Sequence, residues 1–368
     1  MTSSAITPDL QGEIIQGQGE RGISGPYAAF ALRADVQTGL WCQPATLRAR
    51  AARIPVEVVW RRGDRCVARI PFEVAQRSVP VGVGLWRAWS PLARQASLPD
   101  FAFPVREGED RLSLLVRSFG LLGGSGLCDL VRAVNCDVAG YSGGRGVRVR
   151  HRQATYLARL PRDLDAYMAL LSSNTRQALR RRTRRLEREA GQPPELLCYR
   201  AQNEMQPLRE LLSHVWRASW HGRMGGQAPP SRGFLEAMAS QGWVRSYVLQ
   251  VGGAPVASVL GFQHEGTYYD EAPAYDESWR QRSPGIVLNY LMLQDLFATE
   301  PPATIDFGFG FNQYKQMLGT QPCERGELWG ACSARGQRLL TAVGIGDAIY
   351  ALGKRCLGRG GLLRRLKA

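Results

Sequence analysis

The clearest hydrophobic pattern in the chain lies in residues 283–315. Apolar side chains recur at helical spacing over 286–297, on more than one face, which predicts a helix that packs on a sheet. Residues 303–307 predict a short buried strand, and the two glycines that follow it allow the backbone to bend. A short helix is expected from about residue 312. This order predicts an open α/β sheet, in which ligands bind at the carboxyl edge of the strands.

Alternating and helical patterns divide the remaining chain into two halves. The elements expected in the first half are a hairpin of 56–60 and 66–72, a strand at 79–89, a helix at 107–122 and a strand at 128–134. Those expected in the second half are a strand at 196–200, helices at 204–216 and 231–241, strands at 244–250, 255–263 and 267–272, and a last strand at 327–332. Each half mixes strands and helices, which predicts an α/β fold with mixed α+β sheets.

The composition is that of a globular protein of two domains. The chain has 368 residues, 44% hydrophobic and 21% charged, which excludes a disordered or fibrous protein. No apolar run reaches the roughly 18 residues of a membrane span, and no signal segment begins the chain, so a cytoplasmic protein is expected. The eight cysteines form no Cys-x-x-Cys pair and the histidines are dispersed, so no metal site is expected.

The helix that begins after residue 283 has the features of an anion-binding site. Pro284 suits a first helical position, and Gly285 lets a ligand approach the backbone closely. The free N–H groups and the positive end of the helix dipole favour a negative group, to which Arg282 can add a charge-assisted contact. A pyrophosphate fits this description.

These residues carry a resemblance to a known family. The segment Arg282 to Val287, Arg-x-x-Gly-x-Val, resembles the pyrophosphate loop Arg/Gln-x-x-Gly-x-Gly/Ala of the GNAT acyltransferases, with Val287 in place of a small residue. The longer pattern of Ser-Pro-Gly and then Asp-Phe-Gly-x-Gly-x-x-x-Tyr-Lys is similar to the Fem-like branch, especially to acyltransferases found with cellulose and other exopolysaccharide genes. The resemblance implies that acyl-CoA is the donor. Its expected contacts are Arg282, Ser283, Gly285, Ile286 and Val287.

The resemblance also implies two tandem GNAT-like lobes joined by an Arg-rich helical segment. The expected parts are a flexible leader at 1–24, a first lobe without the CoA loop at 25–160, a helical connector at 161–190, an acyl-CoA lobe at 191–335 and a basic C-terminal helix at 336–368. The first lobe is assigned no CoA loop because Phe-Pro-Val, and not Ser-Pro-Gly, precedes its helix. We expect the last helix to be solvated or to rest on a lipid surface.

The chain is strongly basic and most of its basic residues are arginine. There are 47 Lys and Arg against 32 Asp and Glu, a net charge of +15, and lysine occurs only at positions 315, 354 and 367. Arginines are densest in a helix expected at 173–188, where Arg180 is a candidate substrate-binding residue. A charged helix is often only a solvated face, but this density also suits the 3′-phosphate of CoA, a lipid headgroup or an RNA backbone.

Acyl transfer needs a base, an oxyanion site and an acid for the leaving thiolate. Strand alternation points only one of Asp270 and Glu271 into a cleft, where it can act as the base. In GNAT enzymes a tyrosine on the helix after the last core strand often serves as the acid, which nominates Tyr314; a half-buried structural tyrosine is the alternative. Lys315, one of the three lysines, is the remaining catalytic candidate.

Further residues are candidates for supporting roles. Trp220 and His221 lie in an aromatic and basic segment that can line the acceptor pocket, although a lone histidine is more often structural. Asp306 is expected to cap the turn at Gly308 rather than to react.

The sequence therefore predicts an N-acyltransferase, with acetyl-CoA as the default donor and no metal. A small-molecule or glycan amine, such as an amino sugar or a polysaccharide precursor, is the expected acceptor. Two alternatives stay open: an aminoacyl-tRNA-dependent transferase of the same fold, and a non-catalytic accessory protein that binds an anionic membrane surface, a polysaccharide or a nucleic acid through its basic helices.

Overall fold

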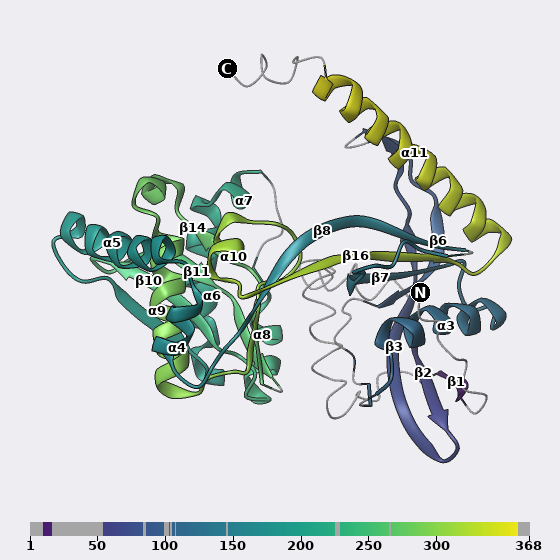
Figure 1. Cartoon of the computed structure of the whole chain (residues 1–368), viewed down its shortest axis with the longest axis horizontal. Helices are drawn as coiled ribbons and strands as arrows, with labels where there is room; N and C mark the ends of the chain where they lie inside the picture. Colours follow the sequence, from purple (N-terminus) through teal and green to yellow (C-terminus); the bar gives the residue numbers. More distant parts are fainter. Residues whose placement is uncertain are drawn as a thin grey trace. The chain divides into compact units, whose positions relative to one another are not determined.

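The computed structural model describes residues 10–16, 54–83, 86–98, 103, 105–106, 108–144, 146–224, 229–264 and 266–359. These residues form two compact units, which mix strands with helices as the sequence predicted (Figure 1). The first unit contains the described residues up to 152 together with those from 326 onward, and the second contains 153–325. The helices expected as a separate connector at 161–190 belong to the second unit, and the last strand crosses from the second unit to the first.

In its described residues the first unit contains a mixed sheet, the small two-stranded sheet of β4 and β5, and two helices. Its elements are β1 (Leu10–Gln16), β2 (Ile54–Arg62), β3 (Arg65–Ser78), β4 (Val81–Val83), β5 (Trp86–Trp89), β6 (Leu92–Leu98), α3 (Arg111–Gly124), β7 (Leu130–Asp137), most of β16 (Gln321–Ala331) and α11 (Ala334–Arg359). The strand order is β1-β2-β3-β6-β7-β16, in which β6 and β7 pair in parallel. The buried side chain of Phe119 on α3 packs into the same core as Ile70 and Leu98 of the strands.

The hairpin expected in the first unit is confirmed, and its neighbours differ from the prediction. β2 and β3 pair in antiparallel fashion around a turn where Gly63 takes a φ of 57°. Residues 10–16, expected to belong to a flexible leader, form β1 and pair with β2; the rest of that leader lies outside the described residues. The strand expected at 79–89 is two short strands, β4 and β5, that pair with each other.

The second unit contains two sheets and the elements of the candidate site. Its elements are the end of β8 (Val147–Arg159), α4 (Leu164–Leu170), α5 (Ser173–Ala190), β9 (Glu195–Tyr199), η2 (Gln202–Glu204), α6 (Met205–Ala218), α7 (Trp220–Arg223), α8 (Arg232–Ser240), β10 (Ser246–Val251), β11 (Ala254–Val259), β12 (Gly261–His264), β13 (Thr267–Asp270), β14 (Ala274–Tyr275), η3 (Glu277–Arg282), α9 (Pro284–Thr299), β15 (Thr304–Asp306) and α10 (Gln313–Leu318). One sheet has the order β14-β11-β10-β9, and β8-β15-β13-β12 are neighbours in the other.

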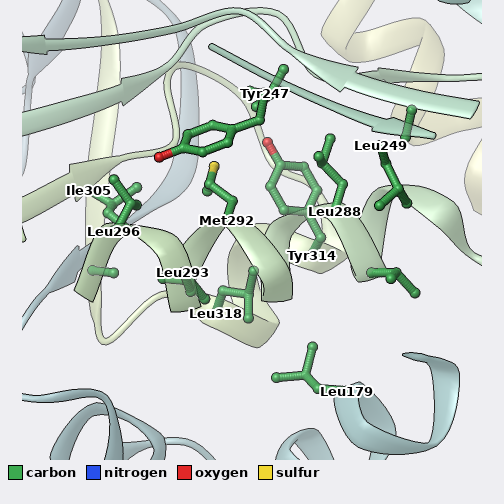
Figure 2. Close-up of a cluster of buried hydrophobic side chains, with 14 of the residues drawn as sticks. Leu179, Tyr247, Leu249, Leu288, Met292, Leu293, Leu296, Ile305, Tyr314 and Leu318 are labelled. Atoms are coloured by element: carbon green, nitrogen blue, oxygen red, sulfur yellow. The ribbon is translucent and has the colours of Figure 1, made fainter. Parts of the chain in front are cut away.

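The apolar helix predicted at 286–297 is α9, and it is buried as expected. Figure 2 shows its side chains gathered with those of β10, β15 and α10; the residues labelled there include Tyr247, Leu249, Leu288, Met292, Leu293, Leu296, Ile305 and Leu318. The far end of α9 is held by Arg245, which is 1% exposed. Its guanidinium donates to the backbone oxygens of Asp295, at 3.2 Å, and Glu300, at 2.6 Å. The guanidinium also forms an ion pair of 3.1 Å with the carboxylate of Asp295, so Arg245 binds the last turn of α9 through both backbone and side-chain oxygens.

Candidate active site

Two parallel strands part at the centre of the second unit. β13 and β15 are paired from Thr267 with Thr304 to Tyr269 with Asp306. Beyond these residues the chain of β13 continues into β14, which pairs with β11 in the other sheet. The chain of β15 turns instead through Gly308 and Gly310, whose φ values of 72° and 95° suit glycine, toward α10. The separation leaves room for a ligand.

A cavity of about 570 Å³ is lined by the residues around this separation. Its walls come from β11, β14, α7, Arg182 of α5, the start of α9 and the start of α10. The residues that carry its chemistry are Ser283, Gly285, Asn289, Asn312 and Tyr314. A site of this size and mixed lining is what a small organic ligand needs.

The start of α9 faces the cavity with an uncapped first turn. Ser283 precedes it in the left-handed conformation, with φ 54°, and its side chain makes no capping hydrogen bond. Pro284 occupies the first turn and has no N–H to donate. The backbone N–H of Gly285 lies too close to the helix start to find an acceptor within the helix. A Cβ added at Gly285 would lie 3.6 Å from Cδ1 of Tyr275, so methyl fits and a larger side chain would enter the cavity.

One turn further into α9, Asn289 presents a buried acceptor. The residue is 4% exposed and lines the cavity. Its Nδ2 donates to the carbonyl of Gly285 at 2.9 Å, and its Oδ1 has no hydrogen-bond partner among the described residues. A buried acceptor without a partner is costly, so a ligand that donates a hydrogen bond here is favoured.

Asp270 and Tyr314 form the most strongly perturbed pair of the site. The phenol of Tyr314 donates to Oδ2 of Asp270 at 3.0 Å. Asp270 is 2% exposed, and burial raises the pKa of its carboxyl from the usual 3.8 to about 7, against the charge of Lys315 and the hydrogen bond from Tyr314, which lower it. Burial and the carboxyl raise the pKa of Tyr314 well above its ordinary value, so this phenol stays protonated.

Lys315 is buried beside this pair but is directed at the glycine turn. Its Nζ donates to the carbonyls of Gly308, at 3.3 Å, and Phe309, at 3.1 Å. Burial lowers the pKa of Lys315, while Asp270 and Asp306 raise it. The lysine therefore holds the turn in place and supplies positive charge near Asp270, but it does not line the cavity.

The turn is also held by Asp306 in the role expected for it. Oδ1 of Asp306 accepts a hydrogen bond of 2.8 Å from the N–H of Gly308, which confirms the predicted cap. Both carboxylate oxygens accept from Arg325 at 2.9 Å, in a bidentate and largely buried ion pair. The hydroxyl of Thr155 in β8 donates to the carbonyl of Gly308 at 2.7 Å.

A second hollow, the arginine groove, has a volume of about 1280 Å³ along α5. Its lining includes Arg176, Arg180, Arg181, Arg182, Arg184, Arg185 and Arg188 of α5, together with Arg282 and Ser283, and the described residues that line it contain no acid. Arg182 and Ser283 line the cavity as well, so the two hollows adjoin.

The predicted site residues are distributed over these two hollows. Those that line the cavity are Trp220, His221, Ser283, Gly285, Ile286 and Tyr314, and those that line the groove are Arg180, Arg282 and Ser283. Arg282 donates to Glu189 at 3.0 Å and lies over the ring of Trp279, 4.8 Å from its centroid. Val287 is fully buried in the core.

The two candidate bases, Asp270 and Glu271, lie in different environments because successive side chains of a strand point to opposite faces. Asp270 is buried beside Tyr314, whereas Glu271 is partly exposed and donates its backbone N–H to the carbonyl of Leu260. On α7, the ring of His221 stacks on Trp216 with centroids 5.8 Å apart and meets Trp220 edge-on at 5.2 Å. The histidine is thus held in an aromatic environment at the rim of the cavity.

Sequence reasoning missed several residues of the cavity. Asn289 could have been identified from the sequence as a candidate ligand contact, because it is the one amide within the otherwise apolar stretch from Ile286 to Leu293. Asn312, which caps α10 through Oδ1, also lines the cavity and could have been identified as an N-cap. Arg280, Glu277 and Tyr275 carried no such signal, because only the fold brings them to the wall.

Comparison with known proteins gives a family match for part of the chain. Residues 173–316 match the family model described as "Acetyltransferase (GNAT) domain". A search of curated proteins finds no match. The chain is similar to the solved structures of FemX (11% identity, TM-score 0.49, 76% of this chain and 88% of that chain), of the C-terminal domain of a putative lysylphosphatidylglycerol synthetase from Agrobacterium fabrum (12%, 0.47, 76% and 84%) and of a tandem GNAT protein from the clavulanic acid biosynthesis pathway (13%, 0.44, 88% and 99%).

The family match lies within the second unit, where the sequence predicted the acyl-CoA lobe. The link to exopolysaccharide genes stays a prediction. Among the described residues no helix is long and apolar enough to cross a membrane. The same residues contain no cluster of three or more side chains suited to a metal ion.

Proposed function

We propose that this protein is an N-acyltransferase that moves an acyl group, by default acetyl, from acyl-CoA to an amine. The observation that carries the proposal is the Asp270–Tyr314 pair, whose phenol reaches the same cavity as the uncapped start of α9. One end of the cavity can therefore bind a phosphate while the other moves a proton. The match of residues 173–316 to the acetyltransferase domain supports this assignment.

Acyl-CoA fits the residues of the cavity. The backbone N–H of Gly285 and the positive end of the α9 dipole suit its pyrophosphate, while the neighbouring N–H groups of Ile286 and Val287 donate to the carbonyl of Ser283. Oδ1 of Asn289 can accept a hydrogen bond from an amide N–H of the pantetheine arm. The arginine groove adjoins the cavity at Ser283 and suits the phosphate of the nucleotide.

The proton transfers that the reaction needs give a role to Tyr314 and to Asp270. The amine nitrogen bonds to the thioester carbonyl carbon, the C–S bond breaks, and one proton must pass from nitrogen to sulfur. Tyr314 lines the cavity and gives its proton to the leaving thiolate. The Tyr314–Asp270 pair then takes the proton that the amine releases, and a carboxyl with a pKa of about 7 is matched to that exchange.

The acceptor is proposed as an amine on a sugar or a polysaccharide precursor. This part rests on the resemblance of the sequence alone. Trp220, which is 57% exposed at the rim of the cavity, is suited to stack on a sugar ring.

Thermal unfolding with and without millimolar acetyl-CoA tests the donor. Ligand at about 100 times its dissociation constant stabilises the folded state by about 2.7 kcal/mol. The shift should persist in Gly285→Ala, whose methyl fits, and disappear in Gly285→Glu, whose carboxylate enters the cavity and repels phosphate. A shift that is the same in both variants would remove the start of α9 from the donor site.

A second candidate, an aminoacyl-tRNA-dependent transferase, is favoured by one observation. The arginine groove is larger than the cavity and its described lining has no acidic residue, which suits a nucleic-acid backbone. In that case an RNA bearing a 3′ CCA end should bind with a steep salt dependence, and acetyl-CoA should give no thermal shift. Binding of neither acetyl-CoA nor RNA would favour the accessory role.

A further inference from the structure

The second half of α11 exposes an apolar stripe. Up to Val343 the helix packs on its own unit through Leu339, Leu340 and Val343, each at most 4% exposed. From Asp347 to Leu352 every side chain is exposed. Ile345, Ile349 and Leu352 are 57%, 52% and 63% exposed, and their spacing of four and three residues places them on one face. α11 therefore stops packing on its own unit while its sequence stays amphipathic (Figure 1).

The hairpin of β4 and β5 adds two tryptophans next to this stripe. Trp86 and Trp89 are 69% and 58% exposed. β4 lies directly against α11, because a Cβ added at Gly346 would lie 2.0 Å from the carbonyl oxygen of Gly82. Gly82 in turn lies against the backbone of Trp86. The hairpin and the stripe are thus neighbours, and together they define the α11 patch: Trp86, Trp89, Ile345, Ile349 and Leu352.

The charges around the α11 patch identify the kind of partner. Asp347 is already neutralised by Arg150, whose guanidinium donates to both carboxylate oxygens at 2.6 and 2.9 Å. No acidic residue follows Asp347 in the sequence, and residues 354–368 contain six Lys and Arg. Arg87 lies between the two tryptophans and is exposed. A protein binds an anionic lipid surface through exposed tryptophans, an aliphatic face of a helix and a sequence whose charges are all positive.

We propose that the α11 patch docks this protein on an anionic lipid surface. The aliphatic stripe and the tryptophans enter the headgroup region, where the exposed Arg87 can meet the lipid phosphates. This inference does not depend on the proposed acyl transfer, because the patch belongs to the first unit and the cavity to the second.

The test is co-sedimentation of the full chain with phosphatidylcholine vesicles that contain or lack phosphatidylglycerol. The chain should sediment with the anionic vesicles, bind the neutral ones far more weakly and be released by salt. The double variant Ile349→Gln with Leu352→Gln should weaken vesicle binding at least about tenfold, because it removes two large apolar side chains that would otherwise be buried in the lipid. The matched control is Leu170→Gln with Met224→Gln, which removes two equally exposed apolar side chains from the second unit.

The outcomes separate the proposal from its rivals. All of these positions are exposed, and an unchanged melting temperature in each variant confirms that it folds. Absence of sedimentation with anionic vesicles, or equal binding by both double variants, would overturn the proposal. Concentration-dependent self-association in analytical ultracentrifugation that the Ile349/Leu352 variant abolishes, without vesicle binding, would assign the patch to a second copy of the chain instead.

Discussion

Tyr314 donates its phenol proton to one oxygen of Asp270, and the other oxygen of that carboxyl has no hydrogen-bond partner in the described part of the chain. The carboxyl is out of contact with water, so its proton exchanges with the cavity through Tyr314. In the proposed mechanism the two residues act as one acid–base unit, of which only the phenol lines the cavity. The predictions about catalysis follow from this arrangement.

Tyr314→Phe should lower kcat by roughly a hundredfold and leave KM for acetyl-CoA nearly unchanged, because a general acid acts on the transition state. Release of free thiol from acetyl-CoA, with glucosamine as the amine, provides the measurement. Tyr290→Phe, on α9 but outside the cavity lining, serves as the matched control. A Tyr314→Phe variant as active as wild type would show that the phenol is only structural.

Asp270→Asn should remove one part of the pH dependence of stability. The folded carboxyl keeps its proton up to about pH 7, whereas the unfolded one loses it near 3.8. Between these values the folded state binds more protons, so the free energy of unfolding falls as pH rises, and the loss is complete above about pH 7. Denaturant titrations from about pH 4 to about pH 8 should show this fall in wild type and a smaller one in the variant.

The control for this experiment is Asp165→Asn, which alters an exposed carboxylate on α4. It should leave the pH dependence as in wild type. Equal slopes for wild type and Asp270→Asn would mean that Asp270 is ionised throughout this range, and its part in proton transfer would need revision.

The fold around this pair could be predicted in outline from the sequence. The apolar spacing of α9, the short strand β15 and the turn residues of the β2–β3 hairpin each signal their structure locally, and all three are present. β8 was not predicted, because its alternation of valine with arginine is short and ends in the polar residues His151, Arg152 and Gln153. It gains its stability from pairing, for example of Leu157 with Asp306, which is distant in sequence.

The chemistry of the site was only partly predictable, for a related reason. The sequence offered Asp270 and Glu271 as equal candidates, since alternation says that one faces inward but not which. The register of β13, with Asp270 opposite Gly261, decides the question. Arg282 was expected to contact a ligand, but the packing of α5 places Glu189 within its reach, and no local pattern reports such a contact.

Arg325→Met should destabilise the second unit by roughly 3 kcal/mol, because it leaves the carboxylate of Asp306 buried without its main counter-charge. Urea unfolding gives the measurement. Arg200→Met is the matched control: its ion pair with Glu300, at 3.3 Å, is exposed, and its loss should cost less than about 1 kcal/mol. Equal costs for the two variants would contradict a structural role for the buried pair.

Arg180→Ala with Arg184→Ala should weaken acetyl-CoA about tenfold by removing charge-assisted contacts in the arginine groove. Titration calorimetry with acetyl-CoA and with its 3′-dephospho form would show whether the loss depends on the 3′-phosphate. Arg217→Ala with Arg232→Ala removes two exposed arginines that do not line the groove, and it should leave affinity unchanged. If both double variants bind alike, the groove is not part of the donor site.

The position of β14 bears on how the affinity for a ligand is divided between main-chain and side-chain contacts. It is the outermost strand in the order β14-β11-β10-β9, so only one edge of its backbone pairs with a strand of that sheet, and its residues Ala274 and Tyr275 line the cavity. A ligand that carries amide groups can extend the sheet there through main-chain hydrogen bonds. Such bonds do not depend on which side chains occupy Ala274 and Tyr275. Alanine scanning along β14 would therefore leave this share of the affinity undetected, whereas a change to the ligand's own amides would reveal it.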